Sequence, residues 1–385
     1  MNKINKFLKT LDWKNVWFFG GTTLLATIGL PIYAYHFGLT KADWILFGFL
    51  AISTMMATTF GHHRLFAHKA FKANKVLQYL NVFFGAAAWE GSVMRWSSEH
   101  RDHHKYVDTD RDPYNIKRGF WFAHMGWFFT KRTPANFDNV KDLSKDKVIL
   151  HQHQNYTLWA VTTGIAIPMF IGLCYGHMWG AFFLAVCGRL FIIHQCVFLI
   201  NSYAHTFGTP TYDLTGSAVD SWVCAFLTNG EGYHSYHHRF PSDYRNGVKW
   251  YHWDPTKWLI FFYSRFGLTT DLNRTPEPKI LLTRGDVEQT KLLDMVNNLK
   301  WDQTKIDQAI LNVEEFYSGV IQKLKEWEVK SIDYKQACKQ IAQMSQAALK
   351  EKSAQVKIAR EEFLNKRKEW LAFMAQFNPA QIQTT

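Results

Sequence analysis

Four long apolar runs constrain the fold of this 385-residue chain more than any other feature of its sequence. They cover residues 16–35, 44–61, 156–176 and 178–203. A helix needs about 20 apolar residues to cross roughly 30 Å of membrane hydrocarbon, and each run has that length or nearly so. Four buried helices of a soluble core would not need to lack charge along most of their length. The runs therefore predict an all-α membrane protein with four transmembrane helices.

Two features refine this prediction. Residues 76–89 form an apolar stretch that is too short to span, and we expect an interfacial or re-entrant helix there. The first long run is about twice the length of the apolar part of a signal peptide, and no small-residue cleavage site follows it. We therefore expect the first run to remain in the protein as a membrane span.

The distribution of lysine and arginine predicts the orientation of the helices. Lys3, Lys6, Lys9 and Lys14 precede the first run, and the long loop between the second and third runs is rich in both residue types. The other two loops carry only Lys41. Because positive charge accumulates on the cytoplasmic side, we expect both termini and the long loop to be cytoplasmic. We expect the membrane to be a bacterial inner membrane rather than the endoplasmic reticulum.

The formal net charge of +12 limits the classes of partner. It fits anionic lipid headgroups or an anionic substrate headgroup, and the sequence carries no nucleic-acid-binding motif. The five cysteines form no CxxC pair, and three of them lie inside the apolar runs. This pattern is typical of small apolar residues in a reducing compartment and not of a disulfide framework.

The composition changes near residue 285. Residues 285–385 are rich in lysine, glutamate and glutamine, and their apolar residues recur at helical spacing. This pattern predicts a C-terminal helical extension, either a hairpin or a coiled-coil-like pair. Residues 1–280 would then form the membrane domain, and the segment around Pro276 and Pro278 is the expected boundary.

Nine of the seventeen histidines occur in four short segments on the predicted cytoplasmic side. The segments HRLFAH, HRDHH, NSYAH and HSYHH contain His63, His68, His100, His103, His104, His205, His234, His237 and His238. In the two HxxHH segments, the spacing i, i+3, i+4 places all three imidazoles on one face of a helix. Crowded imidazoles stabilise one another little, but neutral imidazole nitrogens are good ligands of iron, zinc or copper. We therefore predict that these nine residues bind metal.

The number of ligands indicates how many ions they bind. On an ideal helix, side chains five residues apart point about 140° from each other, so His63 and His68 would serve different ions. Nine ligands also exceed what one ion holds, and they predict two. Zinc is satisfied by three or four ligands, whereas an open, all-imidazole site fits iron that reacts with dioxygen. Glu231, three residues before His234, is expected to support the ligands or to begin a helix.

Four longer segments carry a specific family resemblance. They are GHHRLFAH, WSSEHRDHHKYVDTDRDPYNIKRGFWFAHMGW, INSYAHTFG and NGEGYHSYHHRFPSDY. In order, spacing and flanking residues, they resemble the three histidine boxes of the integral-membrane acyl-CoA desaturases, the stearoyl-CoA (Δ9 fatty acid) desaturase family. The resemblance covers residues 15–280, approximately.

The resemblance implies four membrane helices beneath a cytosolic helical cap in which the nine histidines bind two irons. It also implies that Asn201 reaches one iron through a water and that Arg189 lies within the membrane domain. Because an unpaired arginine in lipid is unfavourable, Arg189 should face the protein interior. His62 is an alternative ligand outside the family pattern, His124 matches a family position without an assigned role, and His194 could support the ligands.

The implied activity is that of a fatty acyl desaturase with two Fe ions as cofactor and O2 as co-substrate. It would insert a cis double bond, at Δ9, into a saturated acyl chain of about 16 to 18 carbons, using two electrons from an external donor. The sequence contains no His-Pro-Gly-Gly segment of a fused cytochrome b-type domain. We therefore expect a separate electron donor, either a ferredoxin or a cytochrome b-type protein with its reductase.

Three residues are candidates for binding the acyl substrate. Trp96 lies one helical turn before His100, where it would form a wall of the acyl tunnel or simply part of the core. Lys131 and Arg132 match a basic pair that meets the coenzyme A phosphates in animal members of the resembled family. Ser98 stands where those members have a basic residue, which leaves acyl carrier protein and membrane lipid open as acyl carriers.

Two other functions stay open at the level of sequence. A histidine-rich membrane hydroxylase or ketolase would use similar boxes to give a different product from a lipid chain. A non-catalytic metal-binding or transport protein would need polar or acidic residues along its spans, and these spans contain almost none.

Overall fold

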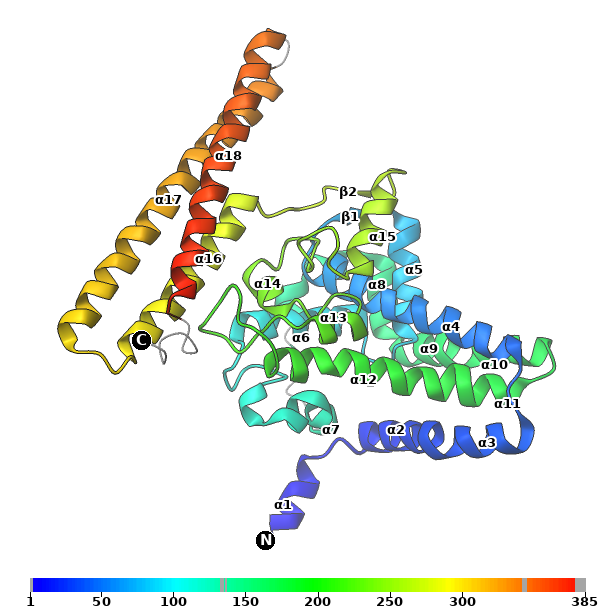
Figure 1. The fold of residues 1–385 in the computed structure, drawn as a ribbon. Coiled ribbons are helices and arrows are strands. Elements are labelled where there is room, and N and C mark those ends of the chain that lie inside the picture. The colour runs from blue at the N-terminus through cyan, green and yellow to red at the C-terminus, as the bar shows by residue number, and fades with distance from the viewer. Residues whose placement is uncertain (1–2, 132–134, 136, 341–344, 378–385) are drawn as a thin grey trace. The chain divides into compact units, whose positions relative to one another are not determined.

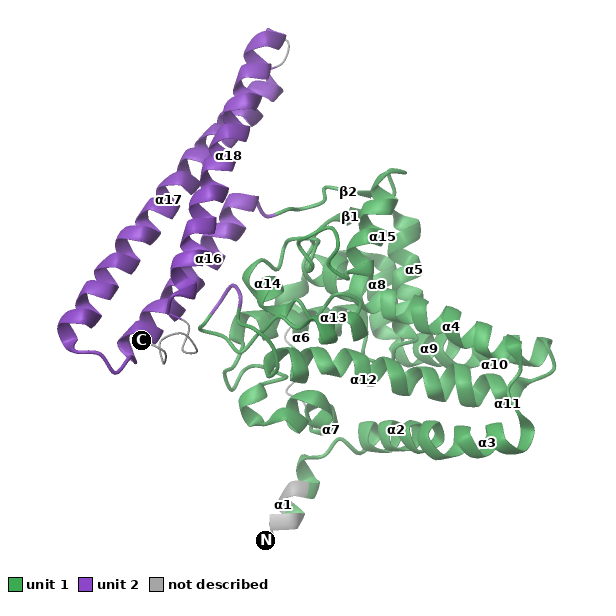
Figure 2. Ribbon diagram, viewed as in Figure 1, with its two compact units in different colours: residues 1–210, 214–274 green, residues 211–213, 275–385 purple. Residues whose placement is uncertain are grey.

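The computed structural model describes residues 3–131, 135, 137–340 and 345–377. The chain divides into two compact units (Figure 2), one made of residues 1–210 and 214–274 and the other of residues 211–213 and 275–385. Within the described ranges, helices make up nearly all of the regular structure (Figure 1), which confirms the predicted all-α class. The exception is a short antiparallel pair, β1 (Lys72–Ala73) with β2 (Thr269–Thr270).

The first unit contains four helices that are long and apolar enough to cross a membrane, as predicted. The first, Trp13–Phe37, comprises α2 (Trp13–Leu24), the π-helix Leu25–Gly29 and α3 (Leu30–Phe37). The second, Lys41–Ala67, comprises α4 (Lys41–Met56) and the π-helix Ala57–Ala67. The third, Tyr156–Cys174, comprises α9 (Tyr156–Val161), the π-helix Thr162–Ala166 and α10 (Ile167–Cys174). The fourth, Met178–His205, comprises α11 (Met178–Gly180), the π-helix Ala181–Gly188, α12 (Arg189–Ser202) and the 3₁₀ turn Tyr203–His205.

A polar cluster fixes the end of the second span that lies opposite His63. Thr40 caps α4 in a capping box with Asp43, which satisfies backbone N–H groups that the first turn leaves free. The buried Asp43 carboxylate also accepts a hydrogen bond from the Tyr175 hydroxyl at 2.8 Å and lies 2.7 Å from His177 Nδ1. Asp43 therefore joins the second span to the connection between the third and fourth spans.

Arg189 and His194 of the fourth span face the protein interior, as expected for Arg189. The fully buried Arg189 guanidinium donates to the carbonyl oxygens of Ala87 at 2.8 Å and Gly164 at 3.0 Å. His194 Nε2 lies 2.7 Å from the carbonyl oxygen of Ala88. The contacts at Ala87 and Ala88 satisfy backbone carbonyl groups just after α5 (Lys75–Ala86), the helix expected from the shorter apolar stretch.

The remaining helices of the first unit are short and surround the histidine segments. They are α1 (Lys3–Thr10), α6 (Val93–Tyr106), α7 (Trp127–Phe129), α8 (Lys147–Gln154), α13 (Trp222–Leu227), α14 (His234–Arg239) and α15 (Pro255–Ser264). Single turns occur at Ile116–Arg118, Phe122–Gly126, Phe137–Val140 and Leu143–Lys145. A core that includes Phe60, Phe71, Val93, Ile149 and Ile260 packs the second span against this layer.

The second unit consists of three helices in its described part. They are α16 (Glu277–Asn297), α17 (Gln303–Lys339) and α18 (Gln346–Ala375). Asp302 and Ser345 accept backbone hydrogen bonds at the starts of α17 and α18, as N-cap residues do. The helices pack through an apolar core around Val313, Phe363 and Trp370. The extension is therefore helical, as the composition predicted.

Candidate metal centre

The first two histidines lie where the second span is a π-helix and not an α-helix. The His68 N–H donates to the His63 carbonyl oxygen at 3.0 Å, which is the i to i+5 bond of a π-helix. This wider turn brings residues five apart to the same side, and the two imidazole centroids lie 4.8 Å apart. The expectation that His63 and His68 point apart is therefore wrong, and the two lie in one group of potential ligands.

Two other helices each divide their histidines between two groups. In α6, which Ser92 caps, His100 and His104 face one group and His103 faces the other. In α14, His237 faces the first group, whereas His234 and His238 face the second. The i, i+3, i+4 spacing thus places each triplet between two clusters and not around a single point.

The structure brings all nine predicted histidines together in these two groups. The potential ligand atoms within each group lie within 4.8 Å of one another. The five-histidine group contains His63, His68, His100, His104 and His237, and the four-histidine group contains His103, His205, His234 and His238. The groups adjoin, because the rings of His104 and His238 stack with centroids 4.2 Å apart.

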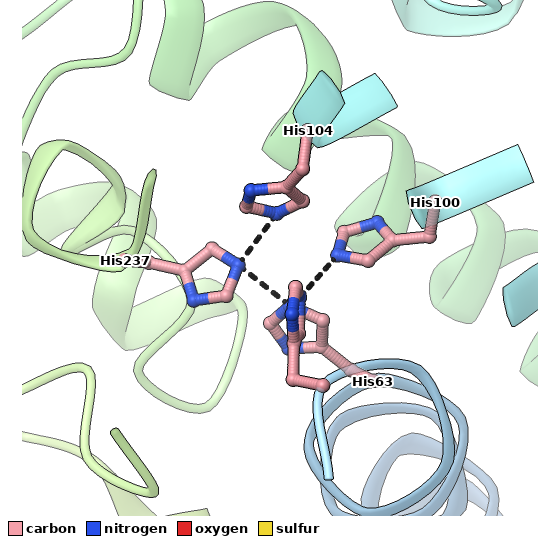
Figure 3. Close-up of side chains that lie close together, drawn as sticks. His63, His100, His104 and His237 are labelled. Carbon is pink, nitrogen blue, oxygen red and sulfur yellow. Dashed lines mark hydrogen bonds between the residues drawn. The ribbon is translucent and has the colours of Figure 1, made fainter. Parts of the chain in front are cut away.

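The imidazole nitrogens of the five-histidine group converge (Figure 3). His237 Nε2 lies 2.9 Å from both His63 Nε2 and His104 Nε2, and His68 Nε2 lies 2.8 Å from His100 Nε2. In the four-histidine group, His234 Nε2 lies 3.1 Å from His205 Nε2 and from His238 Nε2. Nε2 is thus the atom that each of these rings directs toward its neighbours.

Burial keeps most of these rings neutral. Outside the membrane spans, the pKa values of six histidines lie well below the ordinary value. Desolvation by burial is the larger cause, and neighbouring positive charges add to it. The six are His68, His100, His104, His234, His237 and His238. A neutral imidazole has a free nitrogen lone pair, which is the form that binds a metal ion.

In three rings, an acidic or hydroxyl group lies within hydrogen-bond distance of Nδ1, the outer nitrogen that is not directed at the neighbouring imidazoles. His63 Nδ1 lies 2.8 Å from Glu231, and His103 Nδ1 lies 2.8 Å from Asp112. His205 Nδ1 lies 2.7 Å from the hydroxyl of Ser217, which donates to Asp108. Such contacts fix the ring orientation and leave Nε2 for the ion.

Glu231 supports the ligands and pairs with a buried arginine. Its carboxylate lies 2.9 Å from Arg64 Nη2, and Arg64 also pairs with Asp254 at 3.0 Å. Burial alone would raise the pKa of Glu231, but the charges of Arg64 and His63 lower it to about 2. This placement agrees with the supporting role expected for Glu231.

Sequence reasoning missed Asp108, Asp112 and Ser217. The first two lie in the segment DTDRDP, which begins four residues after His104. The sequence therefore already indicated carboxylates that could support the histidine ligands. Ser217 has no comparable signal, since it lies twelve residues after His205 in a loop of irregular structure.

The donor set fits a pair of metal ions. Each group offers four or five imidazoles whose nitrogens converge, and three rings are oriented by a second polar group. Imidazole ligands suit iron, zinc and copper, and four or five ligands per ion match their usual coordination.

Other histidines lie outside the two groups. His124 lies between Ser202 and Gln195, and both nitrogens of the fully buried His62 lack a hydrogen-bond partner within the described residues.

A largely apolar cavity adjoins the histidines. It is lined by Thr58, Thr59, His63, Glu90, Trp96, Glu99, His100, Tyr114, Trp127, Val197, Phe198, Ile200, Asn201 and Glu231. Trp96, the predicted wall of the acyl tunnel, lies in this lining and stacks on His100 with centroids 4.8 Å apart. Asn201 also faces this space, beside His63 and His100.

A second, more polar cavity contains the predicted headgroup residue Lys131. Arg111 and Arg118 line it as well, together with four carboxylates, those of Glu99, Asp102, Asp110 and Asp112. Glu99 and Trp127 line both cavities, so the two spaces adjoin at these residues. Ser98 also lines the second cavity, whereas Arg132 lies outside the described residues.

Comparison with known proteins gives one family. Residues 42–261 match the fatty acid desaturase family. The probable acyl-CoA desaturase of Schizosaccharomyces pombe is 41% identical over 266 residues, which are 68% of this chain and 55% of that protein. The acyl-CoA Delta-12 desaturase of Tribolium castaneum is 34% identical over 282 residues (69% of this chain and 78% of that protein). The Delta(9)-fatty-acid desaturase fat-5 of Caenorhabditis elegans is 33% identical over 280 residues (70% and 82%). This chain thus spans about half the length of the S. pombe relative.

Proposed function

This chain belongs to the fatty acid desaturase family, and we propose that it is a dioxygen-dependent acyl-CoA desaturase. The reaction removes one hydrogen atom from each of two adjacent methylene groups of a saturated acyl chain and leaves a cis double bond. With two electrons and two protons from outside the site, dioxygen is reduced to two molecules of water.

One observation carries this proposal: the five-histidine group, which adjoins the four-histidine group, lines a cavity whose surface is mostly apolar. His63 and His100 of the five-histidine group form part of that lining. The reacting carbons of an acyl chain carry no polar group, so only the shape of the walls can place them beside the metal site. Polar walls would instead favour the transport of a hydrated ion.

Two Fe ions are the proposed cofactor, one held by each histidine group. When bound, they supply the chemistry with dioxygen that amino-acid side chains lack. The protein would hold the ligand rings in place through Glu231, Asp112 and Ser217, which contact the outer nitrogens. Zinc also fits imidazole ligands, and elemental analysis distinguishes the two metals.

The walls of the first cavity would orient the acyl chain. Trp96 lies against His100, and Val197 and Phe198 of α12 line the same space. These apolar side chains would shield the reacting carbons from water. Asn201 supplies a polar side chain beside the histidines, in the position that the family resemblance assigns to an indirect metal contact.

The second cavity is the proposed site of the acyl carrier. Lys131, Arg111 and Arg118 are cations that suit phosphate groups, and Glu99 and Asp102 can accept hydrogen bonds from a nucleotide. Coenzyme A carries phosphate groups and an adenine amino group, so it could use both the cations and the carboxylates of this cavity. Because the two cavities adjoin at Glu99 and Trp127, a thioester there would direct its acyl chain toward the histidines.

The most specific part of the proposal is the position of the double bond. We propose Δ9 in an acyl chain of about 16 to 18 carbons, where chain position is set by the distance from headgroup to metal site. The name of the C. elegans relative supports Δ9, whereas the T. castaneum relative, at similar identity, is named for Δ12. Product analysis decides between the positions.

The electron donor is proposed to be a separate ferredoxin or cytochrome b-type protein that docks on the cytoplasmic side. The lysine distribution supports cytoplasmic termini, and a basic protein attracts an acidic carrier. The three relatives compared are eukaryotic, so they give no support to the expected bacterial inner membrane.

Expression in a desaturase-deficient host tests the proposed function. The fatty acids of the host should gain a cis-monounsaturated product, whose double bond is located by mass spectrometry. The control is His237→Ala, which removes one imidazole from the five-histidine group and should abolish the product. A hydroxylated product would indicate a hydroxylase, and an unchanged lipid profile from a folded, iron-loaded protein would contradict the proposal.

A further inference from the structure

Glu90 is a buried acidic residue that the metal site does not use. Only 4% of its surface is exposed, and it lines the apolar cavity together with His63 and His100. The Trp96 indole N–H donates to Glu90 Oε2 at 3.3 Å. Glu90 Oε1 has no hydrogen-bond partner among the described residues, although it is buried. A carboxyl oxygen in this position is free to interact with whatever occupies the cavity.

The backbone around Glu90 is held firmly on both sides. Arg189 donates to the Ala87 carbonyl oxygen at 2.8 Å, and His194 Nε2 lies 2.7 Å from the Ala88 carbonyl oxygen. On the other side, the Gly91 N–H donates to the Tyr156 hydroxyl at 3.0 Å. Contacts from the third and fourth spans thus fix the short connection between α5 and α6. The position of the Glu90 carboxyl in the cavity is therefore set by its surroundings.

The surroundings of Glu90 favour its protonated form. Burial raises its pKa to about 8, and the Trp96 hydrogen bond offsets this only in part; no cation among the described residues pairs with it. The other titratable groups that line the cavity are His63, His100, Tyr114, Glu99 and Glu231. At neutral pH, Glu90 is therefore a carboxylic acid that can donate a proton.

The proposed desaturation consumes protons beside a cavity whose lining surface is largely apolar. Dioxygen, two methylene hydrogens, two electrons and two protons give two waters, so two protons must enter from solution. The electrons come from the external carrier protein. Glu231 is held ionised by Arg64, and Glu99 accepts a hydrogen bond from Arg95 at 2.9 Å. Neither carboxylate is placed to supply a proton as readily as an unpaired acid.

We infer that Glu90 is the proton donor of this cavity and delivers a proton that forms water during desaturation, an inference that rests on the proposed function. The O–H bond of Glu90 breaks, and an O–H bond of product water forms. The resulting carboxylate takes its next proton from water that enters from the second cavity, which adjoins the first at Glu99 and Trp127.

The test compares Glu90→Gln with Glu90→Asp in the full-length, iron-loaded protein. Glutamine has the same shape and can still accept the Trp96 hydrogen bond, but it has no proton to donate. We expect Glu90→Gln to lower kcat about a hundredfold with little change in KM for the acyl substrate. In the wild type, kcat should fall above about pH 8, as Glu90 ionises. This alkaline decrease should be absent in Glu90→Gln and retained, with partial activity, in Glu90→Asp.

Infrared spectroscopy gives a second readout that needs no turnover. The carbonyl stretch of a protonated carboxylic acid should be present at pH 7 in the wild type, decline above pH 8 and be missing in Glu90→Gln. Unchanged kcat and pH profile in Glu90→Gln would overturn the inference, as would an ionised Glu90 at pH 7. A rise in KM alone would overturn it too, by making Glu90 a wall of the cavity. A wild-type protein that forms no double bond would instead contradict the proposed function itself.

Discussion

The indole ring of Trp96 lies stacked on the imidazole ring of His100, with centroids 4.8 Å apart and planes inclined by 23°. Trp96 therefore forms both a wall of the apolar cavity and the support of a proposed metal ligand. His62 packs on Trp96 as well, with ring centroids 5.7 Å apart. If the proposed function holds, a single side chain would couple the position of the acyl chain to that of the proposed metal site.

Replacing Trp96 should change the product and spare the metal. We expect Trp96→Leu to keep two ions per chain but to lower kcat at least tenfold, because the reacting carbons are no longer held in one place. A mixture of double-bond positions should appear in place of a single one. Mass spectrometry of the products and elemental analysis of the protein measure both effects. A single product formed at the wild-type rate would show that Trp96 does not position the acyl chain.

Acidification should destabilise the metal-free protein. Six histidine pKa values lie well below 6.5 in the folded state, so the unfolded chain binds more protons as the pH falls below 6.5. Stability is therefore highest above pH 6.5 and falls below it, by up to about 1.4 kcal/mol per pH unit for each imidazole. Thermal unfolding of chelator-treated protein at pH 7.5 and 5.5 measures this difference. The double variant His104→Gln, His238→Gln should show a smaller decrease, and an equal decrease would contradict the assignment.

Reversing the charge of Lys131 in the second cavity should weaken binding of the acyl substrate more than it slows the chemical step. Lys131→Glu, alone or with Arg132→Glu, should raise KM for acyl-CoA at least tenfold and change kcat less, since the contact acts equally in the ground and transition states. The matched control is Lys330→Glu, an exposed position in α17. If both variants raise KM equally, general electrostatic attraction accounts for the effect and the cavity does not.

The second unit should be dispensable for the reaction. The proposed ligands and both cavities belong to the first unit, which ends at Arg274. A chain truncated after Arg274 should therefore keep two ions and form the same double bond, while its solubility or oligomeric state changes. Size-exclusion chromatography, elemental analysis and product analysis test this. Loss of iron from a folded truncated protein would assign the second unit a role in the metal site.

The sequence was sufficient to predict the four spans, the all-α class and the nine histidines that the structure brings together. Local spacing reveals which side chains share a helical face, but not which partner each face meets. The division into five and four depends on the π-helix at Ala57–Ala67 and on contacts between residues more than a hundred positions apart. Glu90 and Ser217 also escaped prediction, because the cavity that Glu90 lines and the carboxylate that Ser217 contacts come from segments far apart in the chain.

The anchoring of the Ala87 and Ala88 carbonyl groups by Arg189 and His194 limits how specificity can evolve in this protein. A shift of this backbone would remove the Ala87 acceptor from the buried guanidinium of Arg189 and leave the Ala88 carbonyl without its His194 contact, so we expect mutations that move it to be destabilising. Side chains such as Val197 and Phe198 can vary in size without breaking those hydrogen bonds. Relatives that act on different positions of an acyl chain are thus expected to share this backbone and to differ in the side chains that line it.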